Sequence, residues 1–319
     1  MGQPLPARLL DTALDRSIAL GYSRVGLAVR RHLPGWPADP EPGSLRGQHV
    51  AVTGATSGLG IATAAGLADL GATVHLVVRN EDKARDVVAA LRRDRADARF
   101  EIHRCDVGDL DDVRRFAAGF REAVPDLDAL VHNAGVMPPE RTESPQGHEL
   151  SMAVHVLGPV LMTDLLRPAL RQGRVVLVTS GGMYAQPLPV DDPEFLTGDY
   201  TPTAAYARSK RMQVELAPAL DERWSGDRNT LSTTHPGWAD TPGVAESLPG
   251  FRRLTRPLLR DGAGGADTSV WLAATPGLPS GQLWHDRAIR PTSLVRRTRP
   301  TAEQRQRAWQ WCQDAIATP

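Results

Sequence analysis

The sequence predicts an α/β fold, in which a doubly wound, mostly parallel seven-stranded sheet carries helices on both faces. Two observations support this prediction. Short apolar runs alternate along the chain with longer segments of helical periodicity, an order typical of parallel sheets. Runs such as 74–78 and 175–178 are almost continuously hydrophobic, as expected for strands that are covered on both faces.

The elements follow in a regular order. We expect strands near 48–53, 73–78, 99–104, 127–132, 174–179, 229–234 and 281–285. We expect helices near 59–70, 81–95, 109–123, 146–171, 203–224, 263–274 and 302–316. Together they predict one Rossmann-type domain over residues 46–319 with a C-terminal helix, because no repeat or composition break divides this stretch.

An N-terminal helical extension and a proline-rich linker, residues 1–45, precede that domain. The break at 34–43 is rich in proline and glycine. Residues 14–33 mix apolar positions with arginines, which predicts an amphipathic helix. We expect this helix to dock on the protein's own core, and a helix that touches a membrane surface is the alternative.

Bulk composition excludes several classes of protein. The 319 residues carry 37 basic and 37 acidic side chains, so no overall positive field favours nucleic acid. Cys105 and Cys312 form no CxxC motif, and two cysteines cannot build a disulfide framework. No apolar run is long enough for a membrane span, and charges interrupt any signal-peptide core. We expect a cytoplasmic protein without a metal site.

The segment Thr53–Gly60, Thr-Gly-Ala-Thr-Ser-Gly-Leu-Gly, lies between a predicted strand and a predicted helix. Gly54 permits a tight turn, Gly58 lets the backbone approach a pyrophosphate, and Gly60 lets the helix pack on the strand. Free N–H groups and the helix dipole would then hold phosphate groups. The pattern predicts a dinucleotide site.

Three residues further along the chain predict a catalytic site. Tyr206 and Lys210 are four residues apart, so on a helix they lie on one face, one turn apart. A lysine cation close to a phenol favours the phenolate and would lower its pKa from about 10. Ser180 ends the fifth predicted strand, at the sheet edge where ligands bind. Each residue alone is unspecific; together they predict a general acid/base site.

With Thr53–Gly60, Asn133-Ala134-Gly135, Ser180 and the pair Tyr206/Lys210, the chain resembles the short-chain dehydrogenase/reductase superfamily over residues 46–290. The phrases 179–183 and 235–244, with 265–268 and 280–281, resemble the group called dehydrogenase/reductase SDR family member 12. The resemblance implies an oxidoreductase that transfers hydride to or from a nicotinamide cofactor.

The resemblance also implies roles for single residues. Tyr206 is the general acid/base, Lys210 lowers its pKa and bonds the nicotinamide ribose, and Ser180 polarises the substrate carbonyl. Asp106 contacts the adenine, and Thr241 bonds the carboxamide. The implied cofactor-binding residues are Gly54, Thr56, Ser57, Gly58, Leu59, Gly60, Arg79, Asp106, Val107, Asn133, Ala134, Gly135, Tyr206, Lys210, Pro236, Gly237 and Thr241.

One position departs from the family pattern. The family usually has an asparagine in the long helix after the fourth strand, where it anchors a water linked to the lysine. His155 occupies that position here. An imidazole offers a donor and an acceptor, so we expect His155 to lie within water-mediated reach of Lys210 and to be neutral at pH 7. The alternatives are an interrupted proton relay or a histidine that only packs.

The end of the second strand bears on cofactor choice. An acidic residue there would bind a ribose 2′-hydroxyl and repel a 2′-phosphate. Val78 occupies that place and Arg79 follows, and a guanidinium can pair with a phosphate. We therefore expect NADP(H) to be preferred over NAD(H), although Arg79 on its own also fits an ordinary surface residue.

Substrate contacts are expected from the connections 182–204 and 237–262. The first contains Met183, Tyr184 and Pro187, and the second an apolar set: Trp238, Leu248, Phe251, Leu254, Leu258 and Leu259. This set fits a lid over a lipophilic carbonyl or alcohol, a face between two copies of the chain, or ordinary packing.

The sequence thus predicts an NADPH-dependent carbonyl reductase or alcohol dehydrogenase. A cyclase, epimerase or dehydratase on the same scaffold remains an alternative, because a fold does not fix a reaction. So does a nucleotide-binding protein without turnover, which the departure at His155 would suit.

Overall fold

The computed structural model describes residues 4–170, 172–247 and 249–317. Within these residues one sheet has eight strands in the order β3-β2-β1-β4-β5-β6-β7-β8. The strands are β1 (His49–Thr53), β2 (Thr73–Val78), β3 (Arg99–Arg104), β4 (Ala129–His132), β5 (Arg174–Val178), β6 (Thr230–Thr234), β7 (Gln282–His285) and β8 (Ala288–Ile289). The predicted doubly wound sheet is confirmed, and its strand order reverses between β1 and β4.

The seven predicted strands are all present and run parallel, while β8 is an addition. It pairs antiparallel with β7 across a tight turn at Asp286 and Arg287, both of which have positive φ. Two central residues with positive φ suit the twist of a short hairpin. A two-residue strand leaves no apolar run, so the sequence pattern did not indicate it.

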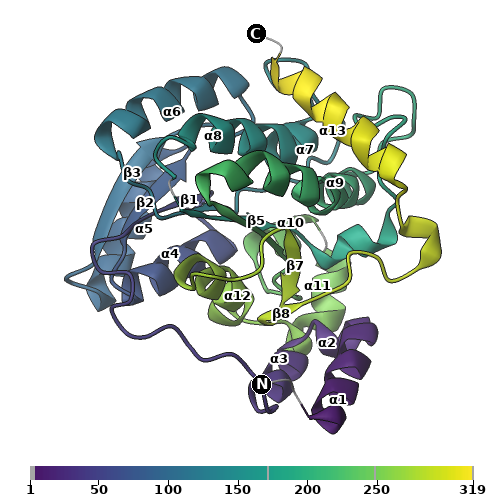
Figure 1. Ribbon diagram of the computed structural model, residues 1–319, viewed down its shortest axis with the longest axis horizontal. Helices are drawn as coiled ribbons and strands as arrows, with labels where there is room; N and C mark the ends of the chain where they lie inside the picture. Colours follow the sequence, from purple (N-terminus) through teal and green to yellow (C-terminus); the bar gives the residue numbers. More distant parts are fainter. Residues whose placement is uncertain (1–3, 171, 248, 318–319) are drawn as a thin grey trace.

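Helices cover both faces of the sheet (Figure 1). Helices α4 (Gly58–Asp69), α5 (Glu81–Asp94) and α12 (Gly262–Ala274) pack on the face that includes Val50, Val52 and Leu76. Helices α6 (Leu110–Ala123), α8 (Gly158–Leu166) and α9 (Pro202–Trp224) cover the other face, and α13 (Ala302–Ala317) packs on the same core. The near-continuous apolar strands are therefore buried on both sides, as their composition requires.

The helix expected at 146–171 is interrupted in the structure. It consists of α7 (Leu150–Met152), a π-helical turn η1 (Ala153–Leu157) and α8. Single π turns inside α-helices are frequent at functional sites, and His155 lies at the centre of this one. The remaining short elements are α10 (Pro242–Ser247), α11 (Pro249–Thr255) and the 3₁₀ turns 181–185, 225–227, 256–258 and 296–298.

The prediction of a single helix over residues 14–33 is wrong. The segment forms three short helices, α1 (Leu5–Arg16), α2 (Ile18–Gly21) and α3 (Arg24–Arg31), and the Ser23 hydroxyl accepts a hydrogen bond from Gly26 N at the start of α3. The segment nevertheless buries Leu14, Tyr22 and Leu27.

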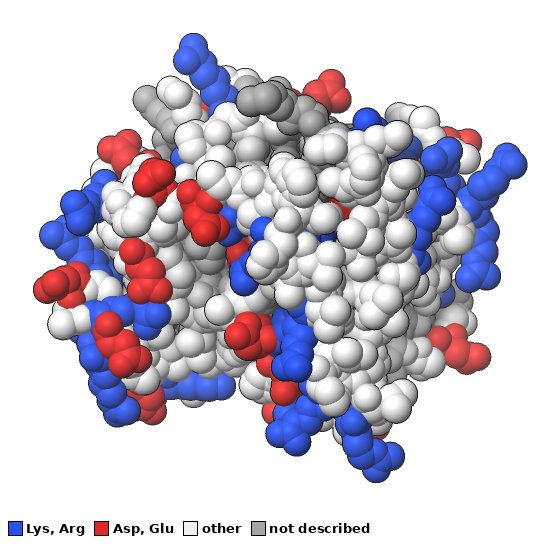
Figure 2. Space-filling model, turned by 90° about the horizontal axis from the view of Figure 1, so that it is seen from below, with Lys and Arg blue, Asp and Glu red and all other residues white. Residues whose placement is uncertain are grey.

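Other apolar side chains of the N-terminal helices point outward. Leu5, Leu9, Leu10, Ile18, Leu20 and Val25 are exposed. Seen from the side of these helices, the surface has a broad uncharged area with charged side chains of both signs at its margins (Figure 2). None of the helices in the described parts of the chain combines the length and apolar character that crossing a membrane requires.

A buried ion network fastens the N-terminal helices to the domain. The Asp286 carboxylate, in the β7–β8 turn, accepts hydrogen bonds from Arg30 on α3 at 2.7 Å and from Arg260 at 2.6 Å. Arg30 also binds Asp11, which in turn pairs with Arg290. These groups are almost fully buried, so each charge depends on its partner.

We predict that Asp286→Asn destabilises the fold by about 3–5 kcal/mol at pH 7, because it leaves two buried guanidiniums without their shared carboxylate. The neighbouring cations hold the pKa of Asp286 far below its ordinary value of 3.8. A lowered folded-state pKa stabilises the fold above the unfolded-state value, and this contribution declines as the pH falls below about 4. Urea unfolding at pH 7 and at pH 3 should therefore give a smaller difference between variant and wild type at the lower pH.

Asp39→Asn is the matched control, because Asp39 pairs with Arg287 at 2.6 Å but is 83% exposed. We expect it to change stability by about 1 kcal/mol at most. Equal effects of the two variants would show that the buried network does not hold the N-terminal helices.

Candidate active site

A cleft of about 930 Å³ opens along the carboxyl ends of the parallel strands. Its volume falls within the range of small-molecule sites. It brings together nearly all the residues that the sequence singled out: Gly54, Thr56, Ser57, Gly58, Leu59, Arg79, Asp106, Val107, Asn133, Ala134, Gly135, Ser180, Tyr206, Lys210, Pro236, Gly237 and Thr241. Gly60 and His155 are not on its wall.

The glycine loop lies at the point where the strand order reverses. Gly54 has φ of 66°, and a side chain there would meet the backbone of Ala134. The Thr53 hydroxyl accepts hydrogen bonds from the backbone N–H groups of Asn133 and Ala134, both at 3.0 Å. The Asn133 amide donates in return to Thr53 O at 3.2 Å. The loop after β1 and the loop after β4 are therefore one hydrogen-bonded unit, and Gly60 packs beneath it.

Ser180, Tyr206 and Lys210 share the other part of the cleft wall. Ser180 follows β5, and its hydroxyl accepts a hydrogen bond from Gly182 N. Lys210 is buried on α9, and its ammonium donates to Val178 O at 2.8 Å. Its Nζ lies 5.7 Å from the centre of the Tyr206 ring. The helical spacing thus places phenol and ammonium on one face, as the sequence predicts.

The pKa of the Tyr206 phenol is shifted in the opposite direction to the one that the sequence predicts. Burial raises the pKa of the Tyr206 phenol, and a hydrogen bond with Ser180 only partly offsets this effect. Burial also lowers the pKa of Lys210 to about 7. We expected Lys210 to lower the pKa of the phenol, but desolvation dominates at this position because the charged form loses its water. Burial, and not the lysine, thus sets the direction of the Tyr206 pKa.

His155 lies behind the cleft wall and joins two of its segments. Its Nε2 accepts a hydrogen bond from Val136 N at 3.0 Å, so Nδ1 carries the proton and donates to Ser209 Oγ at 2.7 Å. Ser209 in turn donates to Tyr206 O. Burial and the Lys210 charge lower the pKa of His155, in keeping with the neutral form expected. Both nitrogens have protein partners, which favours positioning over the proton relay that the sequence suggested.

The end of β2 is more basic than the sequence analysis proposed. Arg79 lies on the cleft wall with its guanidinium 3.9 Å from the Asp106 carboxylate. Asn80 and Lys83 also line the cleft, and neither was predicted. The signal was present in the spacing, because Lys83 follows Arg79 by four residues across the start of α5, which Asn80 caps. Two cations thus border this end of the cleft.

The N-terminal segment supports the loop after β6. Trp238 N donates to Tyr22 O at 2.7 Å, and Arg260 Nε donates to the same oxygen at 3.0 Å. Gly237 has φ of 75°, and a side chain there would collide with Arg260 and Tyr22 O. The sequence analysis missed this contact, because nothing in residues 1–33 indicates where the segment docks.

The expected substrate contacts are confirmed only in part. Trp238 and Phe251 line the cleft, and their rings meet edge to face with centroids 5.1 Å apart. Leu254 is 84% exposed and Leu259 is buried, while Leu248 lies outside the described residues. Met183 and Tyr184, expected at the site, are buried in a separate apolar cluster. Val136, Met137, Leu150 and Val154 supply further apolar wall.

Comparisons with known proteins identify the family of the chain. A family model described as short chain dehydrogenase matches residues 48–190. The dehydrogenase/reductase SDR family member 12 of Bos taurus is 38% identical over 256 residues, which cover 78% of this chain and 79% of that protein. The chain therefore belongs to the short-chain dehydrogenase/reductase family and is an oxidoreductase of that family.

The names of two further matches mention a reaction or a cofactor. One is a protein of Streptomyces sp. (strain C5) named "Putative daunorubicin C-13 ketoreductase DnrU". It is 37% identical over 79% of this chain and 87% of its own length. A crystal structure of a metagenomic short-chain oxidoreductase in complex with NADP is 25% identical, with a TM-score of 0.54 over 79% of this chain and 97% of that one.

We predict that His155→Leu lowers turnover at least tenfold, because it removes the acceptor of Val136 N–H and the donor to Ser209 beside Tyr206. His155→Asn, which restores the residue usual in the family, should retain more activity than His155→Leu. Initial rates and thermal unfolding of both variants distinguish positioning from packing. Unchanged turnover in His155→Leu would show that His155 only fills space.

Proposed function

We propose that this protein is an NADPH-dependent carbonyl reductase. The observation that carries the proposal is the half-buried Tyr206 phenol on the cleft wall, which shares a hydrogen bond with Ser180 and has Lys210 Nζ 5.7 Å from its ring centre. Reduction of a carbonyl needs an acid that is protonated at neutral pH, and a phenol on the cleft wall meets that need.

Tyr206, Ser180 and Lys210 have different roles in the proposed reaction. Tyr206 donates its proton to the carbonyl oxygen, and the Ser180 hydroxyl beside it orients and polarises the same oxygen. Lys210 holds its amino group at the cleft wall by a hydrogen bond from Nζ to Val178 O, where the resemblance assigns it to the nicotinamide ribose. When bound, the nicotinamide cofactor supplies the hydride that reduces the carbonyl carbon. The reverse reaction would use Tyr206 as the base.

The cleft fits such a cofactor. The glycine loop after β1 opens onto it at the first turn of α4, where unpaired N–H groups and the helix dipole favour phosphate. Asp106 extends from the end of β3, and the loop 133–135 follows β4 on the same wall. These are the places that the resemblance assigns to adenine and to the adenosine half of the site.

Three features support NADPH over NADH. Val78 is buried where an acidic residue would repel a 2′-phosphate, and Arg79 and Lys83 both line the adjoining wall. A guanidinium pairs with phosphate by charge-assisted hydrogen bonds, and an ammonium adds a point charge.

The substrate we propose is a lipophilic ketone or aldehyde. The cleft wall near the loop after β4 and the loop after β6 presents Val136, Met137, Leu150, Val154, Trp238 and Phe251. Apolar walls with few polar groups are typical of sites for lipophilic ligands. A panel of carbonyl compounds, followed through the loss of NADPH absorbance, tests the activity.

We predict that Tyr206→Phe lowers kcat by about 10²–10⁴-fold, the usual worth of a general acid, while the NADPH dissociation constant changes little. Tyr184→Phe is the matched control, because it removes a buried phenol that donates to Pro291 O away from the cleft. We expect the control to keep wild-type turnover. If Tyr206→Phe kept more than about a tenth of the rate, the general-acid role would be wrong.

We predict that wild type binds NADPH at least tenfold more tightly than NADH and that Arg79→Ala removes most of this preference. Tenfold corresponds to about 1.4 kcal/mol, a modest value for a charge-assisted contact. Arg85→Ala is the control, because Arg85 lies nearby on α5 but pairs with Glu81 and Asp82 outside the cleft. Equal NADPH and NADH affinities in wild type, measured by fluorescence titration, would refute the assignment.

A further inference from the structure

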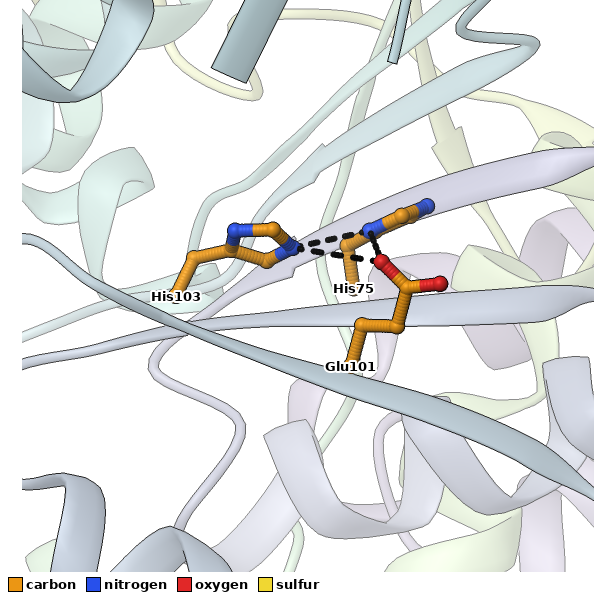
Figure 3. Close-up of side chains that lie close together, drawn as sticks. All are labelled: His75, Glu101 and His103. Atoms are coloured by element: carbon orange, nitrogen blue, oxygen red, sulfur yellow. Dashed lines mark hydrogen bonds and ion pairs between the residues drawn. The ribbon is translucent and has the colours of Figure 1, made fainter. Parts of the chain in front are cut away.

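Three histidines form a row across strands β1, β2 and β3, away from the cleft. His49 Nδ1 lies 2.8 Å from His75 Nε2, and His75 Nδ1 lies 2.9 Å from His103 Nε2. Glu101, on β3, places Oε2 at 3.4 Å from His75 Nδ1 and 3.9 Å from His103 Nε2. In Figure 3 the Glu101 carboxylate and the ring of His103 point toward the same edge of His75.

We propose that His75, Glu101 and His103 bind a divalent transition-metal ion, with zinc as the ion that fits best. Their three ligand atoms all lie within 4.8 Å of one another. The proposal departs from the sequence expectation of no metal, because only the register of β2 with β3 brings these residues together. In that register His75 lies opposite Glu101, and His103 follows two residues later on the same face.

The separations suit a four-coordinate zinc ion. With zinc–nitrogen bonds of about 2.0–2.1 Å, two ligand atoms at tetrahedral positions lie about 3.3 Å apart. The observed separations of 2.9, 3.4 and 3.9 Å lie on both sides of this value. A small movement of Glu101, whose side chain is 52% exposed, would equalise them. Two imidazoles and one carboxylate are ligands that zinc accepts readily, and water would take the fourth position.

The surroundings orient the ligands as metal sites require. In the tautomer that donates from His75 Nε2 to His49 Nδ1, the lone pair of His75 Nδ1 points toward Glu101 and His103. Such a partner for the second ring nitrogen is a regular feature of metal-binding histidines. Phe120 packs edge-on against His75 and His103, with centroids 5.2 and 4.9 Å away, and Phe116 lies beyond. These ring contacts restrict how the two imidazoles can turn.

The three candidate ligands differ in exposure. The His75 side chain is fully buried and that of His103 is 20% exposed, so an ion would enter past Glu101. Among the described residues, the ion-pair partners of Glu101 are these two histidines. The carboxylate is thus available to a cation, and binding would replace the hydrogen bond between His75 and His103. A bound ion would tie β3, the edge strand, to β2.

Titration calorimetry with zinc chloride tests the proposal on metal-stripped, full-length protein without affinity-tag histidines. We expect one zinc ion per chain and an affinity at least tenfold weaker in Glu101→Gln and in His103→Gln. Glu101→Gln alters an exposed side chain, so it serves even if His103→Gln fails to fold. Zinc should also raise the unfolding temperature of wild type more than that of Glu101→Gln, because an ion that binds only the native state stabilises it.

Two controls locate the ion. Glu122→Gln makes the same change at an exposed position on α6, and His148→Gln removes another histidine that pairs with a carboxylate, Glu194. Both should keep wild-type zinc affinity. Cobalt(II) should give the visible absorption of a four-coordinate site in wild type and lose it in His103→Gln. Wild-type affinity in Glu101→Gln and His103→Gln, or no zinc binding in wild type, would overturn the proposal and leave a hydrogen-bonded row of histidines.

Discussion

The buried carboxylate of Asp286 connects parts of the chain that are far apart in sequence. It sits in the turn between β7 and β8 and binds Arg30 of the N-terminal helices and Arg260 of the segment before α12. Arg260 also donates to the carbonyl oxygens of Gly21 and Tyr22. Because an unpaired buried charge is far more costly than a paired one, this turn, the N-terminal helices and the loop after β6 must order together.

This constraint reaches the cleft through the backbone. Trp238 N donates to Tyr22 O, and Arg260 N donates to Trp238 O, both at 2.7 Å. The Tyr22 ring packs edge-on against His235, just before Pro236, with centroids 4.4 Å apart. The wall that contains Pro236, Gly237 and Trp238 therefore rests on a segment that precedes the Rossmann-type sheet. On the opposite wall, His155 performs a similar task by joining the loop after β4 to α9.

Local sequence signals predicted most of the fold and of the cleft wall. Most of the seven parallel strands follow from apolar runs, although β3 alternates polar and apolar residues and β6 is mostly threonine and serine. The residues of the glycine loop, Ser180, Tyr206 and Lys210 follow from motifs whose spacing is local. What the sequence could not show depends on contacts between distant segments. The breaks in the N-terminal helix, the burial of Met183 and the partners of His155 are of this kind.

The pKa of Tyr206 also depends on contacts that the sequence does not show. The four-residue spacing to Lys210 indicated their common face, yet the direction of the pKa shift depends on how much water the fold removes from the phenol. Lys83 was missed for a related reason. A single lysine in a predicted helix does not indicate a binding site, because only the arrangement of β2 and α5 places Lys83 at the cleft.

The central claim is that the Asp286 network couples the N-terminal helices to the cleft wall. Hydrogen exchange followed by mass spectrometry in Asp286→Asn tests it most directly, with Asp39→Asn as the control. The account predicts faster exchange in peptides that contain Trp238 and Arg260, together with those from α2 and α3, while β1 and β4 keep wild-type protection. Unchanged protection at Trp238 and Arg260 in a folded Asp286→Asn protein would contradict it.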